Sequence, residues 1–207
     1  MTNVKTPIRS TLRQKQALAT RSLIVSTARA LFLERGYSCT TIEAIAESAG
    51  VAVSTVYAIF GSKRAILTAI REAWHGQTNI REVVYGSPQA AQPAQRLEQL
   101  AYATRLQWEI GSEVIAIYTG AAAADPEAAN ELAKALEGRR RGLETFAASL
   151  GPYLRQGLDV ARAAAIIQAL CLPEVYKELV QHSGWTAETY QSWLLQALKH
   201  ELLEEAG

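Results

Sequence analysis

Apolar residues recur every three to four positions along most of this chain, which is the spacing of one face of an α-helix. Such stripes cover residues 20 to 35, 40 to 60, 66 to 84, 97 to 121, 132 to 150, 160 to 171 and 186 to 203. Glycine, proline and capping residues separate them. The pattern predicts an all-α fold.

The stripe at residues 40 to 60 divides into two short helices. Thr40 and Glu43 have the spacing of a capping box, so we expect the first helix to begin at Thr40. Gly50 supplies the left-handed residue that ends this helix, and the second helix follows Ala52 with Val56 turned inward. Helices joined by so short a turn cross steeply, which is the helix-turn-helix geometry that presents the second helix to the major groove of DNA.

The residues of this pair and of the helices on either side resemble the DNA-binding signature of the TetR family of bacterial transcriptional regulators. The resemblance covers roughly residues 21 to 75 and is carried by Phe32-Leu33-Glu34-Arg35-Gly36-Tyr37, Gly50-Val51, Thr55-Val56-Tyr57, Phe60, Ser62-Lys63 and Arg64-Ala65-Ile66-Leu67. Two positions depart from the family pattern. Ala52 replaces the small hydroxyl residue that caps the second helix, at a cost of about 1 kcal/mol. Ile59 stands where an aromatic residue or His is common, which bears on base preference.

The outward side of the second helix supplies most of the predicted DNA contacts. Thr55 and Tyr57 carry hydroxyls that can serve a phosphate or a base edge. Lys63 follows the capping residue Ser62, and a lysine at a helix start opposes the macrodipole, which an external anion would explain. The resemblance implies a phosphate contact at this lysine. The full predicted set is Thr41, Val53, Ser54, Thr55, Tyr57, Ala58 and Lys63.

The chain divides into an N-terminal and a C-terminal part. Residues 1–19 are predicted to form a flexible basic arm, which either follows phosphates or a minor groove or is an ordinary solvated tail, the interpretation we prefer. Residues 20–75 form the three-helix DNA-binding domain, and its last helix continues to about residue 85 as a connecting helix. A loop marked by Gly86, Pro88 and Pro93 leads into residues 86–207, for which we expect a helical bundle that binds an effector and dimerises.

Charge is distributed unevenly between these parts. Residues 1 to 75 carry ten Lys and Arg against four Asp and Glu, a net charge of +6, whereas the whole chain has only +1. The remainder is therefore acidic, as suits a protein that meets phosphates with one end only. With 49% apolar and 20% charged residues, the chain is expected to be globular. It has no apolar run near the ~20 residues of a membrane helix and no signal-peptide core, so a cytoplasmic location is expected.

Helix boundaries in the C-terminal part follow from capping and breaking residues. Gly111-Ser112 separates two stripes, and Asp125-Pro126-Glu127 begins a long helix. Asp159 and Thr186 begin the last two long helices. The run Arg139-Arg140-Arg141 is interpreted as a solvated helix face.

The helices at residues 160 to 171 and 186 to 203 leave little polar surface, so they need cover on two sides. A second subunit can supply this cover, and the resemblance implies a four-helix dimer interface made by the final two helices. A large monomeric core is the alternative. The predicted interface residues are Ile167, Leu194 and Leu198, and an isologous dimer demands a pseudo-palindromic DNA site.

The chain shows no arrangement typical of catalysis. His75, His182 and His200 neighbour no suitable partner, and the carboxylates are spread along helix faces, so enzyme activity is not expected. Cys39 and Cys171 lie far apart without a CxxC or His partner. Neither a disulfide nor a metal site is therefore expected, and no cofactor is predicted.

The resemblance implies an effector cavity in the C-terminal bundle, and such cavities are lined by apolar and aromatic groups with few polar anchors. The predicted lining is Tyr102, Arg105, Trp108, Tyr118, Cys171 and Tyr176. An ordinary aromatic core is the alternative. Arg105 indicates an effector with an acidic or aromatic part, although it can equally pair with Glu109 one helical turn on.

Together these patterns predict a repressor that binds a pseudo-palindromic operator in double-stranded DNA as a homodimer. A small-molecule effector of unknown identity is expected to release it. Two alternatives stay open: a helix-turn-helix architectural or corepressor-type factor without a small-molecule ligand, and an α-helical enzyme.

Overall fold

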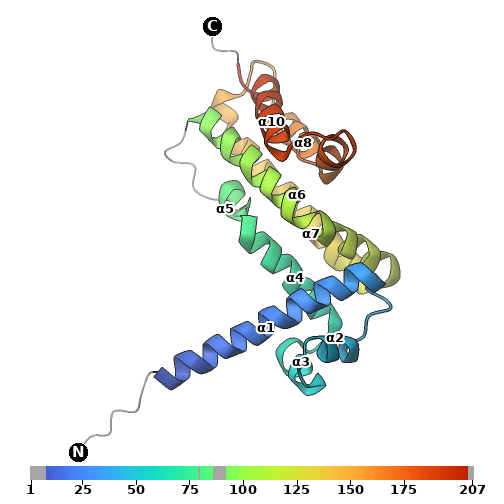
Figure 1. Ribbon diagram of the computed structural model, residues 1–207. Coiled ribbons are helices and arrows are strands. Elements are labelled where there is room, and N and C mark those ends of the chain that lie inside the picture. The colour runs from blue at the N-terminus through green and yellow to red at the C-terminus, as the bar shows by residue number, and fades with distance from the viewer. Residues whose placement is uncertain (1–7, 79, 86–91, 205–207) are drawn as a thin grey trace, which may run out of the picture. The chain divides into compact units, whose positions relative to one another are not determined.

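The computed structural model describes residues 8–78, 80–85 and 92–204, and the regular structure in these ranges is helical (Figure 1). The helices are α1 Ile8–Arg35, α2 Ile42–Ser48, α3 Val53–Phe60, α4 Lys63–Thr78, α5 Ile80–Tyr85, α6 Pro93–Ala124, α7 Pro126–Ser149, a 3₁₀ turn Gly151–Tyr153, α8 Val160–Leu170, α9 Pro173–Tyr176, a π-helical turn Lys177–His182 and α10 Ala187–Leu202. The prediction of an all-α fold is confirmed.

The helices form two compact units. Unit 1 comprises Met1–Glu72 and Ala116–Ala129, and unit 2 comprises Ala73–Ile115 and Asn130–Gly207. Helices α4, α6 and α7 contribute residues to both units. Within unit 1, Tyr118 of α6 donates its hydroxyl hydrogen to the carbonyl of Leu67 of α4 at 3.0 Å.

Unit 1 is built on the later half of α1. One face of this half is buried, through Ile24, Val25, Ala28, Leu31 and Phe32. Helix α2 packs on α1 and on α3. The other helices of the unit add Ile42, Ile45 and Ala46 from α2, Val56 from α3, and Ile66, Leu67 and Ile70 from α4.

Helix α1 begins at Ile8, so residues 8 to 19 are helical where a flexible arm is predicted. That prediction was wrong for these residues because it relied on an apolar stripe, and every side chain from Leu12 to Ala19 is exposed. The segment consists mostly of Leu, Arg, Gln, Lys and Ala, which are good helix formers, and extending a nucleated helix costs little. Residues 1–7 of the predicted arm lie outside the described residues.

The connecting helix is described as two helices. Helix α4 ends at Thr78 and α5 begins at Ile80, whereas the sequence predicts one helix to about residue 85. Residue 79 lies outside the described residues, as does most of the predicted loop, residues 86–91. Pro93, predicted within that loop, is the first residue of α6.

Unit 2 is a helical bundle in which α8 packs on α10. Its core is made by Leu97, Leu100, Trp108, Val114, Leu143, Phe146, Leu150, Ile167, Tyr176, Tyr190, Leu194, Leu198 and Leu202. The predicted caps are confirmed. The carboxylate of Asp159 accepts the amide hydrogen of Arg162 at 2.8 Å, and the hydroxyl of Thr186 accepts that of Thr189 at 3.1 Å. In unit 1, Asp125 caps α7 in the same way.

Helix α6 runs unbroken through Gly111-Ser112, where the sequence predicts a separation between two helices. Gly111 serves close packing instead of a turn. The indole of Trp74 lies against it and donates its Nε1 hydrogen to the carbonyl of Gln107 at 2.9 Å. A Cβ at position 111 would lie 1.9 Å from Nε1 of Trp74, so this site admits the indole only beside glycine.

Gly111→Ala is expected to lower the free energy of unfolding by about 1–3 kcal/mol, the usual effect of overpacking a core, because the new methyl group overlaps the Trp74 ring. Gly120→Ala is the matched control in the same helix. Nothing lies within 4 Å of a Cβ added there, so alanine is expected to raise stability by about 0.5–1 kcal/mol. Urea unfolding of both variants is the measurement. Equal stabilisation by the two substitutions would contradict the packing role of Gly111.

Candidate nucleic-acid interface

Helices α2 and α3 meet at a sharp turn. Their axes change direction by 113° across the break, which is within the range of helix-turn-helix motifs. Gly50 has a φ of 64°, in the left-handed region that favours glycine. The amide of Val51 donates to the carbonyl of Ala46 at 3.0 Å and closes the end of α2. The turn predicted from Gly50 is confirmed.

The cap of α2 lies one residue later than predicted. Thr41, not Thr40, precedes the helix, and its hydroxyl accepts the amide hydrogen of Ala44 at 3.2 Å. Thr40 is fully buried and donates its hydroxyl hydrogen to the carbonyl of Gly36 at 2.8 Å, with that of Leu31 at 3.3 Å. Thr40 therefore ties down the end of α1. The capping-box spacing could not show this because the partner carbonyls come from an earlier helix.

The outward side of α3 is the one predicted. Its exposed residues are Val53, Ser54, Tyr57 and Ala58, which we call the α3 face, and Thr55 beside them is half-buried. Tyr57 is the largest of these side chains and is 48% exposed, whereas Val56 is fully buried. No side chain caps the helix at Ala52, as expected. Because α3 carries no charged residue, attraction to phosphates has to come from the helices around it.

Lys63 is held within unit 1. Its Nζ donates to the carbonyl of Tyr37 at 2.7 Å and to that of Thr40 at 3.0 Å, and it lies 4.2 Å from the centroid of the Tyr37 ring. Burial lowers the pKa of Lys63. Two of its three N–H bonds thus hold the turn between α1 and α2, an internal role that the predicted phosphate contact did not include.

Tyr37 connects these contacts of Lys63 to the start of α7. Its hydroxyl donates to Asp125 at 3.4 Å, and burial together with the charge of Asp125 raises the pKa of Tyr37 to about 12. Arg64, next to Lys63, pairs with Glu127. The beginning of α7 is therefore fastened to the α1–α2 turn within unit 1.

Trp108 and Cys171, two of the predicted effector contacts, meet in unit 2. Both are buried, and Trp108 donates its Nε1 hydrogen to the carbonyl of Cys171 at 3.2 Å. The hydroxyl of Thr104 donates to the sulfur of Cys171 at 3.7 Å. Burial raises the pKa of the Cys171 thiol to about 11, so it is neutral and unreactive at neutral pH.

Two residues that the sequence did not single out lie with them. Arg139 donates Nη2 to the Cys171 carbonyl at 2.6 Å, and its guanidinium carbon lies 5.6 Å from the centroid of a Trp108 ring. Tyr190 is fully buried, with its ring centroid 5.0 Å from that of Tyr176, a third predicted contact. Among the described residues the Tyr190 hydroxyl has no hydrogen-bond partner. Burial lowers the pKa of Arg139 and raises that of Tyr190. We call these five residues the inner cluster.

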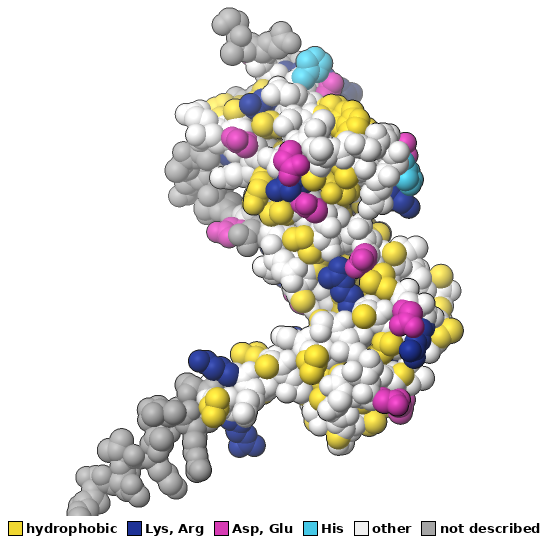
Figure 2. Space-filling model, in the orientation of Figure 1, with side chains coloured by type: hydrophobic (Ala, Val, Ile, Leu, Met, Phe, Trp, Pro, Cys, Tyr) yellow, Lys and Arg dark blue, Asp and Glu magenta, His cyan; other side chains and the backbone are white. Residues whose placement is uncertain are grey.

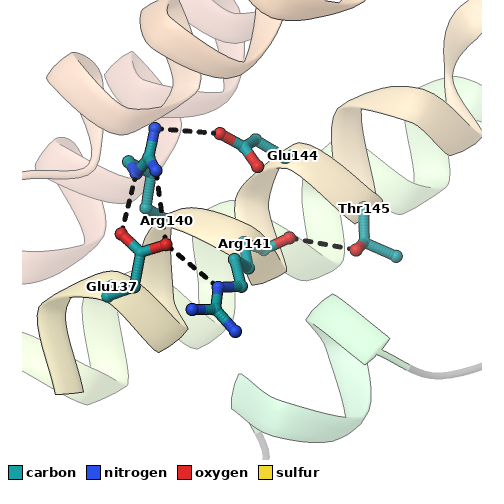
Figure 3. Close-up of polar contacts among 5 residues, drawn as sticks. All are labelled: Glu137, Arg140, Arg141, Glu144 and Thr145. Carbon is teal, nitrogen blue, oxygen red and sulfur yellow. Dashed lines mark hydrogen bonds and ion pairs between the residues drawn. The ribbon is translucent and has the colours of Figure 1, made fainter. Parts of the chain in front are cut away.

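The interpretation of the arginine run as a solvated face is confirmed for two of its members. Arg140 and Arg141 are exposed and share Glu137 as an ion-pair partner (Figure 3). For Arg139 the interpretation was wrong. Arg139 precedes the buried Leu143 by four residues, so it lies on the inner side of α7. That spacing was the signal in the sequence that could have identified it.

The other three predicted effector contacts lie elsewhere. Tyr102 is 49% exposed. Arg105 donates to the carboxylate of Glu109 at 2.6 Å and to the side-chain oxygen of Gln191 at 2.8 Å, so the pairing alternative is confirmed. Tyr118 belongs to unit 1. A hollow of about 610 Å³ in unit 2 is lined by Arg155, Gln156, Gly157, Leu158, Arg162, Ala165 and Ile166, none of them a predicted effector contact.

The predicted dimer contacts Ile167, Leu194 and Leu198 are fully buried within one chain. They lie in α8 and α10, which pack on each other. The assignment of these residues to an interface was wrong, because an apolar stripe does not tell which neighbour covers it. The exposed side of α8 instead carries Ala161, Ala165 and Ala169.

Unit 1 has the fold and the exposed second helix of a helix-turn-helix DNA-binding protein. Residues 24–70, which include α2, α3 and their turn, match the family model of bacterial regulatory proteins of the tetR family. This part of the chain is therefore similar to the DNA-binding domains of that family.

Solved structures of regulators share the fold. NalD, the secondary repressor of the MexAB-OprM multidrug efflux pump in Pseudomonas aeruginosa, has a TM-score of 0.70 and 21% identity, over 92% of this chain and 99% of that chain. The SmeT–triclosan complex has a TM-score of 0.69 and 24% identity, over 91% and 93%. A transcriptional regulator from Saccharomonospora viridis in complex with choline has a TM-score of 0.65 and 20% identity, over 89% and 98%. No curated protein sequence matches this chain.

Within the described ranges no single helix is long and apolar enough to cross a membrane, and one bent pair, α2 with α3, reaches that length and composition only when its helices are taken together. In the same ranges no group of three or more His, Cys, Asp or Glu side chains could hold a metal ion.

Proposed function

We propose that this protein is a cytoplasmic repressor that binds a pseudo-palindromic operator as a homodimer and is released from it by a small-molecule effector. The α3 face carries the DNA-binding part of this proposal, since a 113° turn presents it and its residues are exposed. NalD, which has the same fold, is a repressor, and this supports repression over activation for the present protein. The family match at residues 24–70 favours regulation over catalysis.

Tyr57→Ala is expected to weaken operator binding by about 1–3 kcal/mol, the range of a base contact, because it removes the largest side chain of the α3 face. Thermal stability should stay close to that of the wild type, since this side chain is 48% exposed. Fluorescence anisotropy with duplexes from the region around its own gene, at fixed salt, measures the effect. Unchanged affinity would contradict the reading role of α3.

Lys63→Met is the comparison variant for this experiment. Lys63 holds the carbonyls of Tyr37 and Thr40, so its loss is expected to lower the unfolding temperature and to weaken binding to every duplex. A variant that binds more weakly without losing stability would show that Lys63 acts only on the phosphate.

We place the dimer contact on the exposed side of α8. Ala161, Ala165 and Ala169 repeat there at four-residue spacing, with the half-buried Ile166 and Leu170 beside them. These small apolar side chains would let a second copy of the helix approach closely. The TetR resemblance of the last helices supports the same location.

Ala165→Glu is expected to give folded monomers, because an isologous contact brings the two new carboxylates together. Ala133→Glu, on the exposed side of α7, is the matched control and should leave the dimer intact. Leu194→Glu is expected to unfold unit 2, since this position is fully buried. Sedimentation and circular dichroism distinguish these results, and a dimer of Ala165→Glu would contradict the location.

We place the effector site at the inner cluster. Arg139 is partly buried and forms no ion pair with a carboxylate among the described residues, and a charge that is both desolvated and unpaired is costly. The Tyr190 hydroxyl also lacks a partner there. A carboxylate on a ligand would accept hydrogens from both groups in charge-assisted bonds. SmeT and the Saccharomonospora regulator hold triclosan and choline, which differ in chemistry, so the ligand class is inferred from this chain's own residues.

Small carboxylic acids, each paired with its neutral amide, are expected to release the protein from operator DNA as acids and not as amides. Arg139→Met should lose this response and keep its DNA affinity, whereas Arg141→Met, exposed on the same helix, should respond as the wild type does. By linkage, an acid that weakens DNA binding tenfold must itself bind tenfold more weakly to the DNA complex.

Arg139→Lys keeps a cation beside the Cys171 carbonyl and controls for loss of the fold in Arg139→Met. Release by amides or by cations alone would contradict the acidic ligand. A full response in a folded Arg139→Met protein would contradict the site.

A further inference from the structure

The first part of α1 stands outside the packed part of unit 1. Every side chain from Leu12 to Ala19 is exposed, whereas the buried face begins at Ile24. In Figure 1, α2 and α3 lie beside the later part of α1, and its first part extends beyond them. The side chains of this segment are therefore open to contact by a partner.

The charge of α1 identifies the charge of that partner. From Ile8 to Leu33 the helix carries five Arg and Lys residues and no Asp or Glu. Arg13 and Lys15 form no ion pair among the described residues. The charge of this segment is thus complementary to that of a polyanion.

The positions of Arg13 and Lys15 indicate which kind of polyanion could bind this segment. Residues two apart in a helix point about 200° apart around the axis, so Arg13 and Lys15 lie on opposite sides. Figure 2 shows Lys and Arg side chains on two sides of this end of unit 1. A helix lying in a duplex groove has a row of phosphates along each wall and meets anions on both sides.

The exposed leucines argue against an apolar partner. Leu12 is 58% and Leu18 is 64% exposed. They are six residues apart and so lie on different sides of the helix. The segment has no continuous apolar stripe to enter a groove on another protein or to lie on a bilayer.

The rest of unit 1 leaves a role for such a contact. Helix α3 has no charged residue, and two of the three N–H bonds of Lys63 are taken by backbone carbonyls. DNA affinity arises mainly from neutralising phosphates and releasing their counterions. The reading helix therefore depends on cations placed elsewhere.

We propose that the first part of α1, through Arg13 and Lys15, binds the phosphate backbone of the duplex next to the bases met by α3. The inference rests on the DNA-binding function proposed above. It assigns α1 to affinity and positioning, because phosphates carry no sequence information.

The test is the salt dependence of binding to two duplexes of equal length, one from the region around its own gene and one unrelated. Dissociation constants of the full chain are measured by anisotropy from about 50 to 200 mM salt. The double variant Arg13→Gln with Lys15→Gln is compared with Arg140→Gln and Arg141→Gln, which removes the same charge from the exposed ion-pair group of α7 (Figure 3). Circular dichroism checks that both are folded.

The slope of log Kd against log salt is expected to fall by about 2 per bound chain in the α1 variant, since each lost phosphate contact removes roughly 0.9. The fall should be the same for both duplexes, so their affinity ratio is retained. The α7 variant should keep the wild-type slope. Exchanging the two cations, Arg13→Lys with Lys15→Arg, should keep it as well, because a phosphate reads charge.

Three results would overturn the proposal while the DNA-binding function stands. These are an unchanged slope in the α1 variant, an equal fall in the α7 variant, and a loss confined to the duplex from its own gene region, which would indicate base contacts. If the wild type binds neither duplex, the proposed function itself fails, and this inference with it.

Discussion

The placement of α3 depends on one ammonium group. Lys63 donates to the carbonyls of Tyr37 and Thr40, which lie in the turn between α1 and α2. Backbone groups at helix ends lack intrahelical partners, and hydrogen bonds from a charged donor are stronger than neutral ones. Lys63 is also the first residue of α4 and comes directly after the turn that ends α3. A single side chain therefore ties the entrance of the helix-turn-helix to its exit.

The residues around Lys63 extend this constraint. Thr40 holds the end of α1 through its hydroxyl, and Tyr37 reaches Asp125, which itself caps α7. Each of these groups satisfies a polar atom that burial would otherwise leave unpaired, which is costly in a protein interior. No residue of the α3 face takes part in these hydrogen bonds. This surface is exposed and uncharged, and the proposed phosphate contacts lie on another helix.

Unit 2 has a corresponding centre at the carbonyl of Cys171, where α8 ends. Trp108 and Arg139 both donate to this oxygen. A cation at a helix C-terminus also interacts favourably with the macrodipole. Beside this contact the buried hydroxyl of Tyr190 has no hydrogen-bond partner among the described residues. A stable structural contact and a set of groups suited to an acidic ligand thus lie at one place.

The sequence by itself determined the features that depend on a few neighbouring residues. Helical spacing predicted the all-α fold, Gly50 predicted the turn, and Asp125, Asp159 and Thr186 predicted helix starts, because caps and left-handed turns are made within one turn of chain. Tertiary structure decided which side of each helix is covered. Arg139 lies on the inner side of α7, unlike its two solvated neighbours, and Ile167, Leu194 and Leu198 are buried inside one chain. Gly111 is a packing site for Trp74 instead of a helix break, and the Thr40 hydroxyl binds the end of α1 instead of capping α2. These outcomes depend on helices distant in sequence, and an apolar or charged stripe does not say which of them will lie against it.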